Sequence, residues 1–272
     1  MHERNRYKEP PDFKELAKKF PQLQPFLKTN NNKCYVNFRD PHALLAVTRA
    51  LLKIDFNLNV ELPMDRLIPT VPLRLNYIHW LEDIINVQYN QQVFGIDIGT
   101  GASCIYPLLA ARMNGWNFLA TEVDSKCVSY AQNNVTTNGL DDKIKVKAVA
   151  PHDILYVPLK DDSRQQYDFC MCNPPFFTDS LDAQGANRTS FRPQPKSICT
   201  GDGSEIIYDG GEVEFVKSII EDSTKLLDRV KCYTSMLGKK SSVDRLVSII
   251  RDKKVRFVYI NQNNIIADIR VQ

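Results

Sequence analysis

Strand and helix patterns alternate along the chain from Val93 onward, and this alternation constrains the fold more than any other feature. Apolar, β-branched stretches predict strands at 93–98, 116–121, 143–149, 167–172, 230–237 and 254–260. Between them, helical patterns lie at 102–114, 124–138, 211–228 and 241–252. Such alternation is typical of a parallel sheet with helices on both faces. We therefore predict an α/β fold for residues 86–272.

Residues 1–85 differ in sequence pattern from the rest of the chain. They contain no glycine and show short helical patterns at 12–20, 40–52 and 75–85. Asp40 has the chemistry of a helix cap, and Pro41 suits the first helical position. This segment is predicted to be an amino-terminal helical module. A long polar segment at about 177–210 is too long for an ordinary connection, and such loops are functional lids or disordered.

The first expected strand ends in a glycine turn, Asp97-Ile98-Gly99-Thr100-Gly101-Ala102-Ser103. Gly99 and Gly101 let the backbone approach a ligand, and the amides at the start of the next helix offer donors. The second strand ends at Glu122, where an acid can accept hydrogen bonds from both ribose hydroxyls. A dinucleotide site is the competing interpretation, but its third glycine is replaced by Cys104. The pattern favours an S-adenosylmethionine site.

The tetrad Asn173-Pro174-Pro175-Phe176 follows the strand expected at 167–172. Open α/β sheets bind their ligands at the carboxyl ends of strands. There, the Asn173 oxygen and a proline carbonyl could accept hydrogen bonds from one amino group, while Phe176 offers a stacking face for a base. The plainer interpretation is a proline-stiffened turn with a core phenylalanine. Combined with the glycine turn, the tetrad favours methyl transfer to an amine.

Composition excludes several other classes of protein. Hydrophobic residues make up 43% and charged residues 25% of the chain, which is ordinary for a globular protein. The amino terminus lacks a secretory signal, and no stretch approaches the ~18 apolar residues of a membrane span. Seven scattered cysteines suit reduced intracellular thiols, and Cys170 and Cys172 are interpreted as core residues. No metal-ligand spacing and no Ser-His-Asp order is present, so no metal is expected.

Basic residues gather in two places, although the net charge of +3 is small. One is the first twenty residues, and the other is the long polar loop. Such clusters are often only solvated surfaces, but beside a base-directed active site they favour contacts to phosphates. The predicted RNA-binding residues are Arg4, Arg6, Lys8, Arg188, Arg192 and Lys196.

Five segments resemble the family of methyltransferase-like protein 16. They are the glycine turn with its continuation to Pro107, the tetrad, Gly210-Gly211-Glu212-Val213-Glu214-Phe215, and the runs Met1–Lys8 and Arg66–Trp80. The resemblance covers nearly the whole chain up to about Lys240. It implies a Rossmann-like class I methyltransferase with a seven-stranded type of sheet. The implied activity is N6-methylation of adenosine in U6 small nuclear RNA, and in some members in messenger RNA of S-adenosylmethionine synthetase.

The resemblance also implies roles for individual residues and for partners. Residues expected to bind S-adenosylmethionine are Arg74, Gly99, Gly101, Ser103, Glu122, Asp153 and Asn173. The substrate should be a structured RNA with an unpaired target adenosine, because a paired amine is hidden in the duplex. A nuclear location is implied, with the cytoplasm as a second compartment, and no obligatory protein partner is evident.

Two departures from the family pattern bear on these expectations. Position 153 is Asp where vertebrate members have Thr, and residues 260–268 lack the family's Gln-Gly-x-Thr-x-Arg-Trp motif. The second departure leaves the last strand of the sheet unassigned. It also keeps open an RNA-binding protein with reduced or no methyltransferase activity. Methylation of a protein glutamine is a further alternative, although its tetrad usually ends in Tyr.

Overall fold

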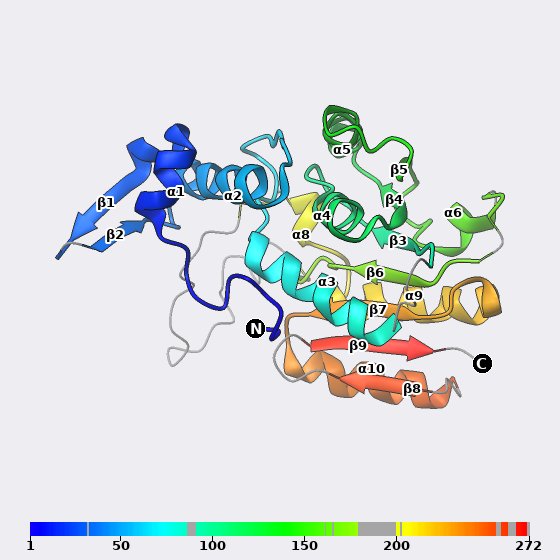
Figure 1. The fold of residues 1–272 in the computed structure, drawn as a ribbon. Helices are drawn as coiled ribbons and strands as arrows, with labels where there is room; N and C mark the ends of the chain where they lie inside the picture. Colours follow the sequence, from blue (N-terminus) through cyan, green and yellow to red (C-terminus); the bar gives the residue numbers. More distant parts are fainter. Residues whose placement is uncertain are drawn as a thin grey trace.

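The computed structural model describes residues 1–31, 33–85, 91–160, 162–164, 166–178, 200–201, 203–253, 257–260 and 265–270. Over these ranges, one seven-stranded sheet runs in the order β5-β4-β3-β6-β7-β9-β8 (Figure 1). The strands are β3 Phe94–Ile98, β4 Asn117–Glu122, β5 Ile144–Ala148, β6 Phe169–Cys172, β7 Tyr233–Leu237, β8 Phe257–Ile260 and β9 Ile265–Arg270. The predicted α/β class is confirmed.

The sheet is mixed, whereas a parallel sheet was predicted. Strands β5, β4, β3, β6 and β7 are parallel, but β9 pairs antiparallel with both β7 and β8. Strand β9 is the strand that the sequence left unassigned. A parallel crossover needs a dozen or more residues, and only four separate Ile260 from Ile265, so these neighbours must run antiparallel.

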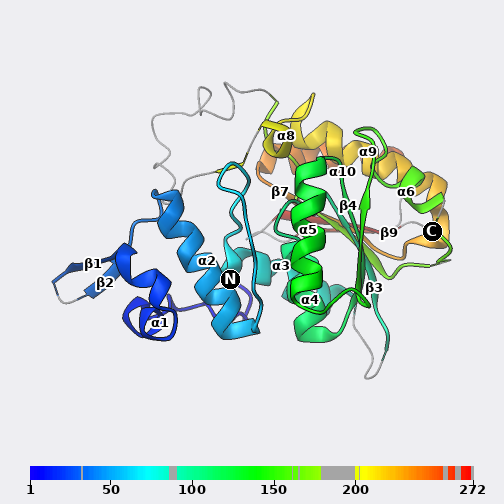
Figure 2. The ribbon, with the colours of Figure 1, turned by 90° about the horizontal axis from the view of Figure 1, so that it is seen from above.

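Two layers of helices cover the sheet, as Figures 1 and 2 show. One face carries α3 Val71–Ile85, α4 Ile105–Asn114 and α5 Ser125–Thr137, and the other carries α6 Tyr156–Lys160, α9 Gly211–Leu226 and α10 Lys240–Asp252. Strand residues alternate between the layers. Phe169 and Met171 face the first layer, while Cys170 and Cys172 are buried against the second, as the core interpretation predicted.

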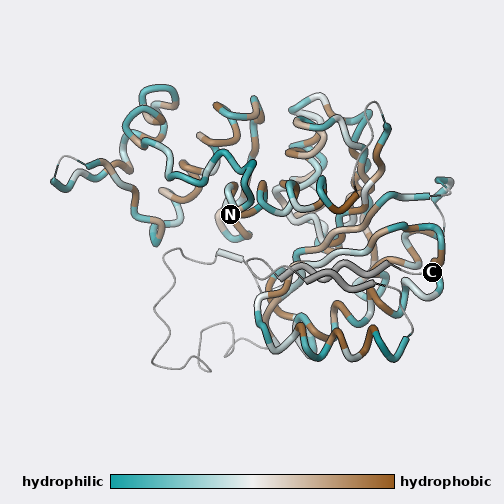
Figure 3. Tube along the Cα trace, turned by 60° about the horizontal axis from the view of Figure 1, so that its bottom comes forward, coloured by the Kyte–Doolittle hydropathy of each residue, from teal (hydrophilic) through white to brown (hydrophobic). Residues whose placement is uncertain are grey.

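Apolar and polar residues alternate along α9 and α10 (Figure 3), and most of the buried positions of each helix hold apolar residues. In α10, for example, Val243, Leu246 and Ile250 are buried. This spacing of three and four residues places them on one side of the helix. The packing fixes the strands, and the strand ends in turn carry the site described below.

The first 85 residues form α1 Phe13–Lys19, η1 Pro21–Phe26, β1 Leu27–Asn30, β2 Lys33–Val36, α2 Pro41–Phe56 and α3. Asp40 caps α2 as predicted, accepting from the amides of His42 and Ala43. The β1–β2 hairpin was not predicted. Buried residues of α1 and α2 join the same apolar cluster as α3, α4 and the sheet, so this segment packs directly on the α/β layers.

No helix in the described part of the chain is both long and apolar enough to span a membrane.

Candidate active site

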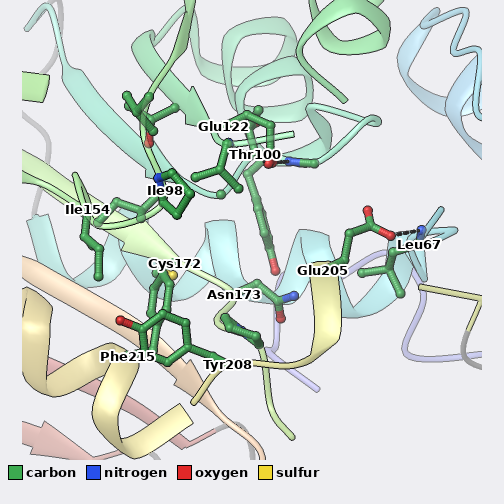
Figure 4. Close-up of a pocket in the computed structure, with 18 of the residues that line it drawn as sticks. Leu67, Ile98, Thr100, Glu122, Ile154, Cys172, Asn173, Glu205, Tyr208 and Phe215 are labelled. Carbon is green, nitrogen blue, oxygen red and sulfur yellow. Dashed lines mark hydrogen bonds between the residues drawn. The ribbon is translucent and has the colours of Figure 1, made fainter. Parts of the chain in front are cut away.

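A cavity of about 350 Å³ opens at the carboxyl ends of β3, β4 and β6. Ile98, Glu122 and Cys172, at the ends of these three strands, surround the same space (Figure 4). Arg74 of α3 lines it as well. Of the predicted site residues, the cavity wall contains Arg74, Gly99, Gly101, Ser103, Glu122, Asp153, Asn173 and Pro175. Segments separated by up to about a hundred residues therefore meet where the sequence placed the site.

The glycine turn leaves β3 with both glycines in the left-handed region, at φ 69° for Gly99 and 63° for Gly101. An added Cβ would meet no atom within 4 Å at Gly99, so backbone conformation rather than crowding requires glycine there. The Thr100 amide donates to Thr121 on the neighbouring strand, at 2.9 Å. Helix α4 begins at Ile105, three residues later than predicted, because the turn continues through Cys104 at φ 48°.

Glu122 joins the glycine turn to the end of its own strand. Its Oε2 accepts from the Gly101 amide at 2.8 Å, and its Oε1 accepts from the amides of Val123 and Asp124 at 2.8 and 3.0 Å. The residue is only 7% exposed. The carboxylate therefore organises the cavity wall by itself, beyond the ribose contact that the sequence predicted.

Asp97 lies beneath the turn and is fully buried. Its Oδ2 accepts from the Thr100 hydroxyl at 2.7 Å, while Oδ1 has no partner among the described residues. Burial, together with the nearby charge of Glu122, raises the pKa of Asp97 to about 7, although the Thr100 hydroxyl and Arg74 act in the opposite direction.

Arg74 reaches the cavity from α3. Its Nη1 donates to Tyr106 Oη at 2.7 Å and to Asn173 Oδ1 at 2.8 Å, and the guanidinium lies 5.4 Å from the centre of the Tyr106 ring. No carboxylate of the described residues pairs with it, and its buried Nε has no hydrogen-bond partner there. The cation is thus available to a ligand that carries a carboxylate.

The tetrad divides between the cavity and the core. Asn173 and Pro175 line the cavity, Pro174 is buried without lining it, and the partly buried Phe176 lies beside it. A Cβ on Gly238, after β7, would lie 3.0 Å from Phe176 Cδ1, so the glycine lets this loop pass close to the ring.

Glu212 holds that loop in place. Its two carboxylate oxygens accept from the amides of Gly238 and Lys239, at 2.6 and 3.0 Å, and it is 2% exposed. Gly210 and Gly211, at φ 77° and 65°, precede it at the start of α9. The resemblance to Gly-Gly-Glu pointed to this segment, but the capping of a distant loop could not be read from spacing.

The cavity is roofed by residues on either side of a long chain segment. Glu205 accepts from the Leu67 amide at 2.8 Å (Figure 4), and Thr200 Oγ1 accepts from the Ile68 amide at 2.8 Å. On the other side of the segment, Phe177 pairs with Ile207 in a short parallel bridge. Sequence reasoning missed these contacts and the cavity-lining residues Tyr106, Glu205, Tyr208 and Phe215.

Three of the predicted RNA-binding residues, Arg4, Arg6 and Lys8, do not line the cavity. Arg4 is paired with Glu82 and Asp83 of α3, and Arg6 with Asp55 of α2, although each arginine side chain remains about half exposed. Lys8 is exposed. The other three, Arg188, Arg192 and Lys196, lie outside the described residues.

Comparison with known proteins agrees with this geometry. A family model described as RNA methyltransferase matches residues 1–265. This chain belongs to the RNA methyltransferase family. Within that family it is 54% identical over 257 residues to the RNA N(6)-adenosine-methyltransferase METTL16 of Mus musculus, covering 92% of this chain and 46% of the relative. The chain thus spans about half the length of this relative.

A second relative is the U6 small nuclear RNA (adenine-(43)-N(6))-methyltransferase of Drosophila pseudoobscura pseudoobscura, 40% identical over 261 residues, with 94% of this chain and 86% of that protein covered. Among solved structures, the human Mettl16 catalytic domain in complex with MAT2A 3′UTR hairpin 1 matches at a TM-score of 0.91 and 48% identity, covering 100% and 95% of the two chains. The amino-terminal domain of human METTL16 in complex with SAH matches at a TM-score of 0.84 and 44% identity, covering 100% of this chain and 98% of that domain.

Proposed function

We propose that this chain transfers a methyl group from S-adenosylmethionine to N6 of an unpaired adenosine in a structured RNA. U6 small nuclear RNA is the first substrate proposed, because a relative's name specifies it, and a messenger RNA hairpin is the second. The observation that carries the proposal is the position of Asn173, at the end of β6 and in the same cavity as the glycine turn and Glu122.

The residues that line the cavity, together with Asp97 beneath the glycine turn, fit S-adenosylmethionine in their chemistry. Arg74 is a cation without a carboxylate partner among the described residues, and Asp97 Oδ1 is a buried acceptor without a donor there. A ligand with an amino acid group carries the matching carboxylate and ammonium. Two glycines at positive φ allow close approach of the backbone, and Glu122 lies where ribose hydroxyls would be recognised. The SAH complex of a 44% identical domain supports the assignment.

The proposed contribution of the chain to the reaction is orientation rather than acid or base catalysis. When bound, the cofactor supplies an electrophilic methyl group on its sulfonium. The Asn173 oxygen and the Pro174 carbonyl would accept hydrogen bonds from the adenine amino group, which keeps its lone pair directed at the methyl carbon. Phe176 would hold the base by stacking. Roof contacts through Glu205 and Thr200 would keep water out of the cavity.

We further propose that residues 1–85 form an RNA-binding module, and residues 86–272 the methyltransferase domain with its loop at about 177–210. Lys8 and the exposed halves of Arg4 and Arg6 would contact phosphates, joined by Arg188, Arg192 and Lys196 from the loop. The half-exposed state of both arginines supports this, since a guanidinium has donors beyond those used in its ion pair. A small nuclear RNA substrate places the enzyme in the nucleus, and cell fractionation would test for a cytoplasmic pool.

Mass spectrometry of nucleosides from U6 small nuclear RNA, incubated with the protein and isotope-labelled S-adenosylmethionine, tests the function. We expect labelled N6-methyladenosine with the parent chain and none with Asn173→Ala. The variant should bind the RNA within a few-fold of the parent, because Asn173 acts on the amine and makes few ground-state contacts. Label recovered in protein glutamine, or in no product, would reject the proposal.

A further inference from the structure

The Asn173 oxygen that the proposed reaction requires is already occupied. Arg74 Nη1 donates to Asn173 Oδ1 at 2.8 Å, across 99 positions of sequence. An amide oxygen with a charged donor in place is a poorer acceptor for an incoming adenine amino group, and the guanidinium also takes up space beside it. In this arrangement the cavity is not ready for the base.

A carboxylate in the cavity would compete with Asn173 for the guanidinium of Arg74. A neutral amide is the weaker partner for a guanidinium, and a carboxylate can accept two parallel hydrogen bonds from it. The Nε atom is buried and lacks a partner among the described residues, so turning of the guanidinium plane can gain a bond there.

Tyr106 provides a fixed point for such a turn. Its ring is 3% exposed, its hydroxyl accepts from Arg74 Nη1 at 2.7 Å and donates to Met236 Sδ at 3.2 Å. The guanidinium can therefore exchange one partner while its contact with the tyrosine keeps it in the cavity. Both arrangements use groups that are already in place.

We propose that Arg74 is a positioning residue that couples the two ligands: it holds Asn173 in the ligand-free protein and releases it when the cofactor's carboxylate binds. The inference rests on the proposed function. Its consequence is a preferred order, in which cofactor binding prepares the adenine site. The coupling is reciprocal, so RNA and cofactor each tighten the binding of the other.

The test compares two nucleosides by calorimetry without RNA. S-adenosylhomocysteine carries the amino acid group, whereas 5′-methylthioadenosine shares its adenosine and thioether but has no carboxylate. Asn173→Ala removes the competing acceptor, so it should bind S-adenosylhomocysteine about three- to tenfold more tightly than the parent. Asn173→Asp keeps the shape of the side chain but adds a charge, so it should strengthen the competing contact with Arg74. This variant should bind S-adenosylhomocysteine about three- to tenfold more weakly than the parent. Neither variant should change the affinity for 5′-methylthioadenosine.

The parent chain gives a second test that needs no variant. Its affinity for a U6 small nuclear RNA transcript should rise by a few-fold, and no more, with saturating S-adenosylhomocysteine, and it should stay unchanged with 5′-methylthioadenosine. Weaker binding of S-adenosylhomocysteine by Asn173→Ala, or equal effects of both nucleosides on RNA affinity, would overturn the coupling while leaving the proposed function intact. If neither nucleoside binds the parent, the proposed cofactor fails and the coupling fails with it.

Discussion

The hydroxyl of Tyr77 lies 2.8 Å from the hydroxyl of Thr234, in the buried layer between α3 and the sheet. Thr234 donates onward to the Cys170 carbonyl at 3.0 Å, so Tyr77 is the donor to Thr234. Tyr77 also accepts from the Cys172 amide at 3.4 Å, next to Asn173. A single chain of hydrogen bonds thus connects α3, which carries Arg74, with the end of β6.

Tyr77→Phe should lower the free energy of unfolding by about 1–2 kcal/mol, because the Thr234 hydroxyl and the Cys172 amide, both buried, each lose their hydrogen bond to the tyrosine hydroxyl. Urea unfolding followed by circular dichroism measures this. Tyr130→Phe is the matched control, since Tyr130 is only partly buried, and it should stay within about 0.5 kcal/mol of the parent. Equal midpoints for both variants would show that the buried hydroxyl contributes nothing.

Asp97 should make stability depend on pH. Its folded pKa of about 7 exceeds the unfolded value of about 3.9, so the folded state binds the extra proton between these values. Its stabilising contribution is complete below about pH 3.9 and is lost as pH rises through about 7. The stability of the parent relative to Asp97→Asn should fall from pH 5 to 7, by up to about 1.4 kcal/mol per unit, and level off above that. A difference that stays constant from pH 5 to 8.5 would contradict the assignment.

Glu122→Gln should impair both folding and cofactor binding, because an amide NH₂ cannot accept from the amides that the carboxylate now serves at Gly101, Val123 and Asp124. We expect S-adenosylhomocysteine binding to weaken by about 1.5–3 kcal/mol in Glu122→Ala, with a similar loss in Glu122→Gln. Calorimetry without RNA isolates this effect. Full affinity in the glutamine variant would mean that the charge is dispensable.

Gly238→Ala should shift the ring of Phe176, since the new Cβ would lie 3.0 Å from Phe176 Cδ1 and 3.3 Å from Glu212 Oε2. A few tenths of an ångström at the stacking face should reduce kcat/KM for RNA several-fold, while the affinity for S-adenosylhomocysteine is unchanged. Single-turnover rates and calorimetry on the same preparations separate the two effects. A matching loss of cofactor affinity would place the ring shift inside the cofactor site instead.

Lys8 and Arg6 should respond differently to substitution. Lys8→Ala removes an exposed charge and should flatten the slope of log K against log salt for RNA binding by roughly 0.7–0.9, without affecting stability. Arg6→Ala breaks the ion pair with Asp55 and should in addition lower stability by about 0.5–1 kcal/mol. Salt titrations that overlay the parent's for both variants would remove these residues from the RNA surface.

The cavity was predictable from sequence where local chemistry dictates it. Gly99 and Gly101 adopt conformations that favour glycine, and the acid at the carboxyl end of β4 follows from the strand order of an α/β sheet. The Arg74–Asn173 contact was not predictable, because no local pattern records which side chains meet across 99 positions. The β1 strand was missed because its pattern is mostly exposed and its register depends on β2 alone. Strand β9 was left unassigned because the family motif there is missing, yet its backbone pairs with β7 regardless.

The roof contacts have a consequence for how the chain tolerates change in length. Phe177 is fixed on one side of positions 179–199 by Ile207, and Thr200 and Glu205 are fixed on the other by the amides of Ile68 and Leu67. Both anchors belong to described parts of the fold, and the entropic cost of closing a chain between two fixed ends grows only slowly with its length, by about 0.6 kcal/mol for each doubling. The anchors, rather than the length of the interval, therefore set the position of Glu205 over the catalytic cavity.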